Sequence, residues 1–323
     1  MIRRQRVAAE SLEFAPVEGE AEGPVAIDRA ADALLDEYAQ GTWDTQRLSG
    51  LSAAQMAFGK LFGGPACAWY GGLPCLLVYA VSAPQGAARL STLFSAVALA
   101  ISLHALCLLA TLLAARRTPR LSAPRGLLLL LMFVLVSWSY GFTRRDLALV
   151  EMPVRWYGHD WTPDGFTSFS LACLLGWSVL GLYRALREEL AFRDAPLAWI
   201  GFVLFAWLYT GGFVWNGETP APLALQLAIA VAISGATTYA LLLIERKDWL
   251  RLRRLLAALR ERPADPWRIG ALLPLWLCSA LLGVLALLLL ALHVVVLPPT
   301  PRPVADLATL LALLLFLGRD LAL

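Results

Sequence analysis

Charge, histidine and catalytic motifs are scarce in this chain. Only 16% of its 323 residues are charged and 59% are hydrophobic, whereas a water-soluble protein of this length needs far more charge to cover its surface. The three histidines lie far apart, which argues against a metal hydrolase. GxSxG and HExxH are absent, and Gly59-Lys60 lacks the Ser or Thr that follows the lysine of a phosphate-binding loop. We therefore expect no enzymatic activity, no metal or other cofactor, and no nucleic-acid partner.

Reactive and ionisable side chains are also few within the apolar stretches. His104 and His293 fall there, and lone histidines of this kind are expected to be hydrogen-bonded packing residues rather than proton relays. No pair of carboxylates is placed for coupling to protons or sodium, which disfavours a secondary transporter. Without CxxC or Cys/His spacing, the cysteines are expected to be free thiols that pack as small apolar side chains. They are Cys67, Cys75, Cys107, Cys173 and Cys278.

Long apolar stretches are what the chain has in abundance. A membrane-spanning helix needs about 20 mostly apolar residues. The windows that satisfy this are Gly64–Ala83, Leu90–Ala115, Gly126–Phe142, Phe166–Leu186, Leu197–Trp215, Pro222–Ile244, Ile269–Leu297 and Val304–Leu323. Because these runs are continuously apolar and do not alternate, helices are expected rather than barrel strands. The predicted fold is an all-α polytopic transmembrane bundle of about eight spans within residues 64–323, in which pairs such as Gly71/Gly72, Gly211/Gly212 and Gly235/Ala236 let helices approach closely.

The basic residues lie in alternate loops. They are Arg116, Arg117, Arg120 and Arg125; Arg184, Arg187 and Arg193; and Arg246, Lys247, Arg251, Arg253, Arg254, Arg260, Arg262 and Arg268. Short loops rich in Lys and Arg stay in the cytoplasm. These three loops and the N-terminus are therefore predicted to be cytoplasmic.

One predicted outer segment, Thr143–Gly165, is longer and carries charges of both signs. Aromatic residues at a membrane boundary usually belong to the interfacial belt. We expect a small re-entrant or surface helix with Trp156 and Trp161 resting on the headgroups. A substrate gate on the outer face is the alternative.

Two soluble segments are predicted on the cytoplasmic side. Residues 1–50 form a partly disordered N-terminal segment, with an amphipathic helix expected over Ile27–Tyr38. Ser49 is then expected to cap a short interfacial helix within residues 51–63. That helix carries Leu51, Ala54, Met56, Phe58 and Leu61.

The second soluble segment is a basic amphipathic helix within residues 246–262. Trp249, Leu252, Leu256 and Leu259 recur at helical spacing, and Arg251, Arg253, Arg254 and Arg260 occupy the rest of the helix surface. Such a helix lies along an anionic inner leaflet. We therefore predict a membrane-surface site formed by Trp249, Arg251, Arg253 and Arg254, with contact to a cytosolic protein as the alternative.

The segment Asp36–Lys60 has the most distinctive residue pattern. It contains an acidic pair, then Gly-Thr, then a Leu-Ser turn, then a short helix that ends in Gly-Lys. In this it resembles a stretch found in permease subunits of type-2 ABC transporters. The residues that match are Glu37, Gly41, Thr42, Leu51, Ser52, Gly59 and Lys60.

The resemblance implies a cytoplasmic coupling helix that docks in a groove of a separate ATP-hydrolysing subunit. Asp44 and Arg47 would then provide polar contacts, and Met56 and Phe58 would fill a pocket. It also implies a multi-pass protein of a bacterial inner membrane that forms a homodimer or a heterodimer of permeases. The alternative function is a non-transporting scaffold or assembly subunit that binds partners through its basic cytoplasmic helix. A short helix that only orients the first span would produce the same pattern.

Overall fold

The computed structural model describes residues 34, 36–37, 40–83, 86–115, 153–192, 195–215, 223–244, 249–261 and 266–296. The described helices and strands are α2 (Thr42–Leu48), α3 (Ala53–Phe58), the π-helix η1 (Gly59–Gly63), α4 (Ala66–Ser82), α5 (Ala87–Ala115), β1 (Val154–Trp156), β2 (His159–Trp161), α7 (Pro163–Glu189), α8 (Leu197–Val214), α9 (Leu223–Ile244), α10 (Trp249–Arg260), α11 (Pro266–Leu272) and α12 (Leu275–Val296). The predicted spans Gly126–Phe142 and Val304–Leu323, and most of the predicted helix Ile27–Tyr38, lie outside the described residues.

Five of the described helices are long and apolar enough to cross a membrane. They are α5, α7, α8, α9 and α12. The number is six if the bent pair formed by α3–η1 and α4 is counted as one further span. Each of these five helices overlaps a window predicted from hydropathy, as does α4, whereas α3–η1 precedes the first window. The expectation of a helical, multi-pass membrane protein is thereby confirmed for the described part of the chain.

The outer surface of the bundle is apolar, as a protein surrounded by lipid requires. On α12, Leu281, Leu285, Leu288 and Leu292 are between 50% and 62% exposed. These positions recur every three or four residues and therefore form one face of the helix. On the opposite face, Ala286 and Leu287 are buried and pack against Ala230 and Val231 of α9.

Several buried polar side chains find their hydrogen-bond partners inside the helices, whereas the Nε2 atom of His104, buried in α5, has none among the residues that the structure describes. Ser102, Thr111 and Thr238 donate hydrogen bonds to the carbonyl four residues earlier, at 2.6, 2.9 and 2.6 Å. Two tryptophans reach across to buried serines, as when the Trp199 indole donates to Ser279 Oγ at 2.8 Å. In hydrocarbon no water is available for such groups, so these internal partners remove a cost of several kcal/mol per group.

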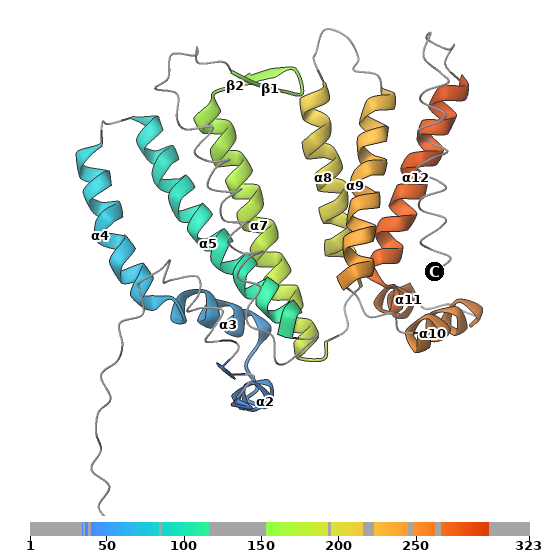
Figure 1. Cartoon of the computed structure of the whole chain (residues 1–323), viewed down its shortest axis with the longest axis horizontal. Coiled ribbons are helices and arrows are strands. Elements are labelled where there is room, and N and C mark those ends of the chain that lie inside the picture. Colours follow the sequence, from blue (N-terminus) through green and yellow to red (C-terminus); the bar gives the residue numbers. More distant parts are fainter. Residues whose placement is uncertain are drawn as a thin grey trace, which may run out of the picture.

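The short helices gather at one end of the bundle and the hairpin lies at the other. Figure 1 shows α2, α3, α10 and α11 at the lower end, which we call the short-helix end, and β1–β2 at the upper end, the hairpin end. Among the described helices, the pairs with the most extensive contact are α5 with α7 and α9 with α12. Between α7 and α8 the contact is aromatic, because the Trp177 ring lies 5.4 Å from Phe202 and 5.5 Å from Phe205.

Residues 154–161 form a β-hairpin, where the sequence analysis predicts a surface helix. Its two-residue turn is Tyr157-Gly158, and both residues have positive φ, 51° and 73°. A type I′ turn requires this conformation and glycine supplies it readily. Trp156 does not rest on headgroups. Its indole donates to the Tyr209 carbonyl at 3.0 Å, and its ring packs among aromatics of α7 and α8.

The hairpin is also tied to α8 by its turn. The Tyr157 amide donates to the Gly212 carbonyl at 2.9 Å, and its hydroxyl donates to the Leu208 carbonyl at 2.8 Å. Burial raises the pKa of the Tyr157 phenol above its ordinary value, so the hydroxyl keeps its proton at neutral pH. The hairpin therefore acts as a fixed cover over the ends of α7 and α8.

The predicted span Ile269–Leu297 is broken near its start. α11 ends at Leu272, and α12 begins at Leu275, after Leu273 and Pro274. Proline has no amide hydrogen to continue a helix, and it disfavours helical geometry in the residue before it. The spanning helix therefore begins at Leu275, and the residues before it belong to a separate short helix.

The close approach of Trp156 to Gly212 gives a direct test of the hairpin packing. A Cβ atom at Gly212 would collide with the Trp156 indole, whereas one at Gly235 in α9 meets nothing within 4 Å. We expect Gly212→Ala to destabilise the protein by about 1–3 kcal/mol through overpacking. Gly235→Ala should be neutral or stabilising by up to about 1 kcal/mol, because alanine favours a helix. The measurement is the temperature at which the monodisperse chromatographic peak is lost in detergent, and equal midpoints for the two variants would contradict the packing.

Candidate functional site

The segment that resembles a coupling region contains two helices. α2 begins after Gly41, which has a φ of 71°, and ends where Ser49 donates through its hydroxyl to the Gln46 carbonyl at 2.6 Å. Ser49 therefore lies at the C-terminal end of α2, whereas the sequence predicts it as the N-cap of the following helix. The second helix, α3, is capped by Ser52, because Gln55 N donates to Ser52 Oγ at 3.3 Å and Ser52 N donates to Gln55 Oε1 at 2.9 Å. This reciprocal pair is a capping box.

The α3 helix continues as η1 and then turns sharply into α4. The break lies at Gly64-Pro65, and the two helical parts meet at 62°. Gly64 keeps helical dihedral angles, and a Cβ atom there would lie only 3.3 Å from the Lys60 carbonyl oxygen, so the close approach favours glycine. Pro65 has no amide hydrogen and stops the hydrogen-bond ladder. The segment α3–η1 therefore lies across the base of the bundle and leads directly into α4 (Figure 1).

A buried apolar cluster fixes the segment to the spans. Its members from the segment are Leu34, Trp43, Ala53, Met56, Ala57 and Leu61, all at most 6% exposed. They pack against Leu108 and Leu112 of α5 and against Leu182 and Leu186 of α7. Full burial of one large apolar side chain contributes about 1.5–3 kcal/mol. Several such side chains make the described residues between 34 and 61 a firmly attached part of the bundle.

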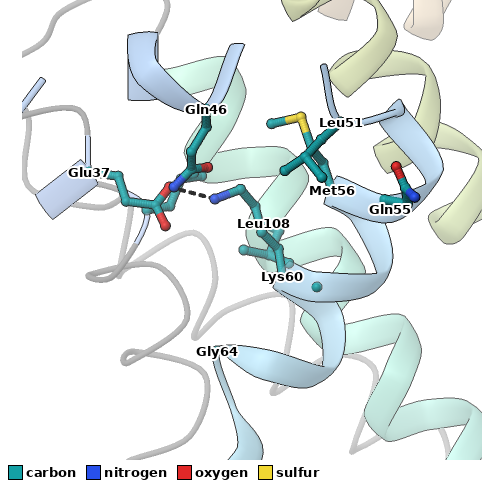
Figure 2. Close-up of a pocket in the computed structure, with 10 residues that line it drawn as sticks. Glu37, Gln46, Leu51, Gln55, Met56, Lys60, Gly64 and Leu108 are labelled. Atoms are coloured by element: carbon teal, nitrogen blue, oxygen red, sulfur yellow. Dashed lines mark hydrogen bonds and ion pairs between the residues drawn. The ribbon is translucent and has the colours of Figure 1, made fainter. Parts of the chain in front are cut away.

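An ion pair holds the two ends of the segment together. Lys60 Nζ lies 2.5 Å from Glu37 Oε2, with side-chain exposures of only 14% and 28%. Figure 2 shows Lys60 pointing toward Glu37. Lys60 Nζ also lies 4.8 Å from the centre of the Trp43 ring, a cation–π distance. The Thr42 hydroxyl donates to the Glu37 carbonyl at 3.2 Å, which fixes the start of α2.

The predicted coupling residues differ in their contacts within the chain and in their exposure. Glu37, Thr42, Met56 and Lys60 are engaged within the chain, and Met56 is only 4% exposed. Gly41, Arg47, Phe58 and Gly59 are exposed, with Phe58 at 67%. Asp44 lies within α2. Trp43 is not among the residues predicted from the sequence, although a large aromatic side chain between two polar residues is a signal of a buried helix face.

Two hollows flank the segment. A cavity of about 240 Å³ lies between α2, α3 and α5, where Glu37, Gln46 and Lys60 meet Leu51 and Met56 (Figure 2). A shallower groove of about 340 Å³ lies between the last turn of α2 and the end of α7, which we call the α2–α7 groove. Its lining residues are Arg47, Leu48, Glu189, Leu190 and Ala191. Leu48 is 86% exposed there. A single exposed apolar side chain is common on protein surfaces, so the groove by itself identifies no partner.

The predicted membrane-surface residues all lie in α10. The Arg251 guanidinium donates to the Leu272 and Leu273 carbonyls, both at 3.1 Å, so this arginine is bound to the end of α11. Arg253 and Arg254 are exposed. The helix packs through Leu255 and Ala258, whereas Leu256 and Leu259 of the predicted apolar face are 49% and 55% exposed.

No metal-binding cluster of three or more His, Cys, Asp or Glu side chains occurs among the described residues. His104 is buried in α5, where its Nδ1 lies 2.7 Å from the Ala100 carbonyl and its ring lies 5.6 Å from that of Trp69. The Nε2 atom of His104 is buried without a hydrogen-bond partner in the described part of the chain, so the helix satisfies only one of the two ring nitrogens. The fold and the site thus define a multi-pass helical membrane protein with a rigidly attached surface segment at its short-helix end.

Comparison with other proteins adds no family to this description. The chain matches no protein-family model, no curated protein and no solved structure. Its function is therefore argued from its own residues.

The Glu37–Lys60 pair gives a prediction that separates a structural contact from an incidental one. In a double-mutant cycle with Glu37→Gln and Lys60→Gln, we expect a coupling free energy of about 1 kcal/mol or more, since the pair is largely shielded from solvent. Arg268 and Glu261 form the matched control, because their side chains are 59% and 50% exposed. That pair should couple by about 0.5 kcal/mol or less. The free energies come from reversible unfolding in mixed micelles, and equal couplings for the two pairs would refute the assignment.

Proposed function

We propose that this chain is the membrane-spanning permease subunit of an ABC-type transporter, which moves its substrate with ATP hydrolysed by a separate subunit. Its place would be the inner membrane of a bacterium, and its working form a dimer of permeases. The proposal draws on the resemblance of residues 36–60 to the coupling region of type-2 permeases. The chain contributes no nucleotide-binding motif of its own, so the energy for transport has to arrive through a protein contact.

The proposed orientation places the short-helix end in the cytoplasm. It follows from the basic residues after α7 and around α10, because loops rich in Lys and Arg remain cytoplasmic. In this orientation the α2–α7 groove faces the compartment that holds ATP, and the hairpin lies outside. The order of basic and uncharged loops along the sequence supports the same arrangement.

The observation that carries the proposal is the attachment of residues 34–61 to the spans. A coupling element must be rigid, so that a movement of the partner is transmitted and not absorbed. Met56 and Leu61 are buried against α5 and α7, and the Glu37–Lys60 pair joins the start of the segment to its end. A displacement of α2 or α3 by the partner would therefore move α5 and α7 together, and η1 would transmit the displacement to α4.

The surface offered to the partner would be the α2–α7 groove. Arg47 and Glu189 give it charges of both signs, and Leu48 gives it an apolar side chain that is 86% exposed. An apolar anchor surrounded by polar residues is the usual composition of a protein contact. Phe58, at 67% exposure on α3, is a second candidate anchor.

The alternative function is a scaffold that binds partners through α10. This function predicts a different contact surface at the same end of the molecule, where α10 and α2 lie apart (Figure 1). Exposed leucines on each surface, Leu48 and Leu256, allow the two functions to be separated by single substitutions of the same kind.

Leu48→Asp and Leu256→Asp provide that test. The chain is co-expressed with a candidate ATPase, such as the product of a neighbouring gene with a phosphate-binding loop, and purified through a tag on the membrane subunit. We expect Leu48→Asp to reduce the retained ATPase about tenfold or more, as loss of an interface anchor does. Leu256→Asp should leave retention unchanged.

The reverse result, with retention lost only in Leu256→Asp, would favour the scaffold. Retention of no ATPase by the unaltered chain would contradict the transporter proposal. Both variants are compared with the parent chain by chromatographic profile, so that misfolding is recognised before retention is interpreted.

A further inference from the structure

The helix α10 carries an exposed apolar stripe that the bundle does not use. Leu252, Leu256 and Leu259 stand four and three residues apart, and therefore share one side of the helix. Leu256 and Leu259 are 49% and 55% exposed. Arg253 precedes Leu256 by three residues and Arg260 follows it by four, so both arginines border this stripe.

The other side of α10 has a different character. Ala257 and Arg254 lie there, turned away from Leu259 by roughly half a turn of the helix at 3.6 residues per turn. Both are exposed. The helix thus has one leucine side bordered by two arginines, and an opposite side with Arg254, Ala257 and, in the first turn, Leu250, which is 62% exposed.

Contacts at both ends of α10 fix which way the stripe faces. Leu255 and Ala258 are 3% and 2% exposed and form the buried side of α10, which contacts α11. Near the first turn, Arg251 donates to the carbonyls of Leu272 and Leu273, groups left without partners where α11 ends. Just beyond the last turn, Glu261 accepts from Arg268 at 2.6 Å. The buried Leu255 and Ala258 and the hydrogen bonds of Arg251 therefore orient the stripe away from the bundle, and the exposed Glu261–Arg268 pair adds little to this.

The position of α10 relative to the spans is restricted as well. Only residues 245–248 separate it from the end of α9, and α11 joins it to the start of α12. At about 3.5 Å per residue this link holds α10 close to the ends of two spans. Figure 1 shows α10 lying crosswise there, beside α11.

We propose that α10 is a binding site for anionic phospholipid, with Leu256 and Leu259 inserted at the acyl-chain boundary and Arg253 and Arg260 bound to headgroup phosphates. The planar guanidinium forms paired hydrogen bonds with phosphate oxygens, and its long stem reaches from the helix to the headgroup layer. Charge complementarity selects this occupant, because α10 holds four arginines and no acidic residue. The lipid contact set is thus Arg253, Leu256, Leu259 and Arg260, with Arg251 assigned to the α11 junction.

The test uses the whole chain in bilayers made of equal parts phosphatidylglycerol and phosphatidylcholine. An environment-sensitive fluorophore is attached to Leu259→Cys in a background without the five native cysteines. Quenching is measured with one lipid brominated at a time, and the ratio of the two values reports the preference of the site for the anionic lipid. We expect strong quenching with a preference for phosphatidylglycerol. The same probe at Ala257→Cys should be quenched far less.

Arginine variants identify the headgroup contacts. Arg253→Gln and Arg260→Gln should each lower the phosphatidylglycerol preference about fivefold, as expected for a cation near an anionic surface. Arg254→Gln should leave the preference unchanged. Arg253→Lys should preserve only part of it, since lysine keeps the charge but not the paired hydrogen bonds of the guanidinium.

Three outcomes would overturn the proposal. The first is equal quenching at positions 257 and 259, and the second is an equal loss of preference in Arg254→Gln. The third is a Leu259 probe that lipid does not quench but that becomes shielded when a cytosolic protein is added, which would assign the stripe to a protein partner. An unchanged chromatographic profile establishes that each variant is folded. The proposal does not depend on transport, so it can fail while ATPase retention through Leu48 holds.

Discussion

The rest of the structure depends on one constraint: a polar group inside the hydrocarbon must find its partner within the chain. Long α-helices satisfy the backbone, which is why five spanning helices dominate the described residues. Most of the polar side chains described within them follow the same rule, with His104 Nε2 as an exception. Ser102, Thr111 and Thr238 bond to their own helices, and Ser234 and Ser279 accept from tryptophans on α8. Charge is left to the ends of the bundle, where water and headgroups are available.

The two ends of the bundle are built differently as a result. At the hairpin end, aromatic packing fixes a rigid cover, with Trp156 set against Gly212 so closely that no side chain fits between them. At the short-helix end, amphipathic helices lie crosswise and present charged or apolar side chains outward. The proposed roles follow this division. Residues 34–61 are attached firmly enough to transmit force, and α10 is oriented firmly enough to select a lipid.

Hydropathy predicted the spanning helices because length and apolar composition are properties of a single segment. Hydropathy does not predict features that depend on a turn or capping residue, or on a contact with a residue distant in the sequence. The Tyr157-Gly158 turn was hidden by the aromatic residues around it, which equally suit a membrane-boundary helix, and Pro274 ends α11 inside a window that averages as apolar. Ser52 outcompetes Ser49 as a cap because Gln55 stands three residues after it. The Glu37–Lys60 pair joins residues 23 positions apart, and no single-segment pattern reveals such a contact.

The central claim is that the helices cross lipid with the short-helix end in the cytoplasm and the hairpin outside. The most direct test is labelling of single cysteines in intact cells with a membrane-impermeant maleimide, in a background without the five native cysteines. One cysteine replaces Leu48, which is 86% exposed in α2, and another replaces Asp160, exposed in β2. The account predicts labelling at position 160 in intact cells and at position 48 only after the membrane is permeabilised. Labelling at position 48 in intact cells would contradict it.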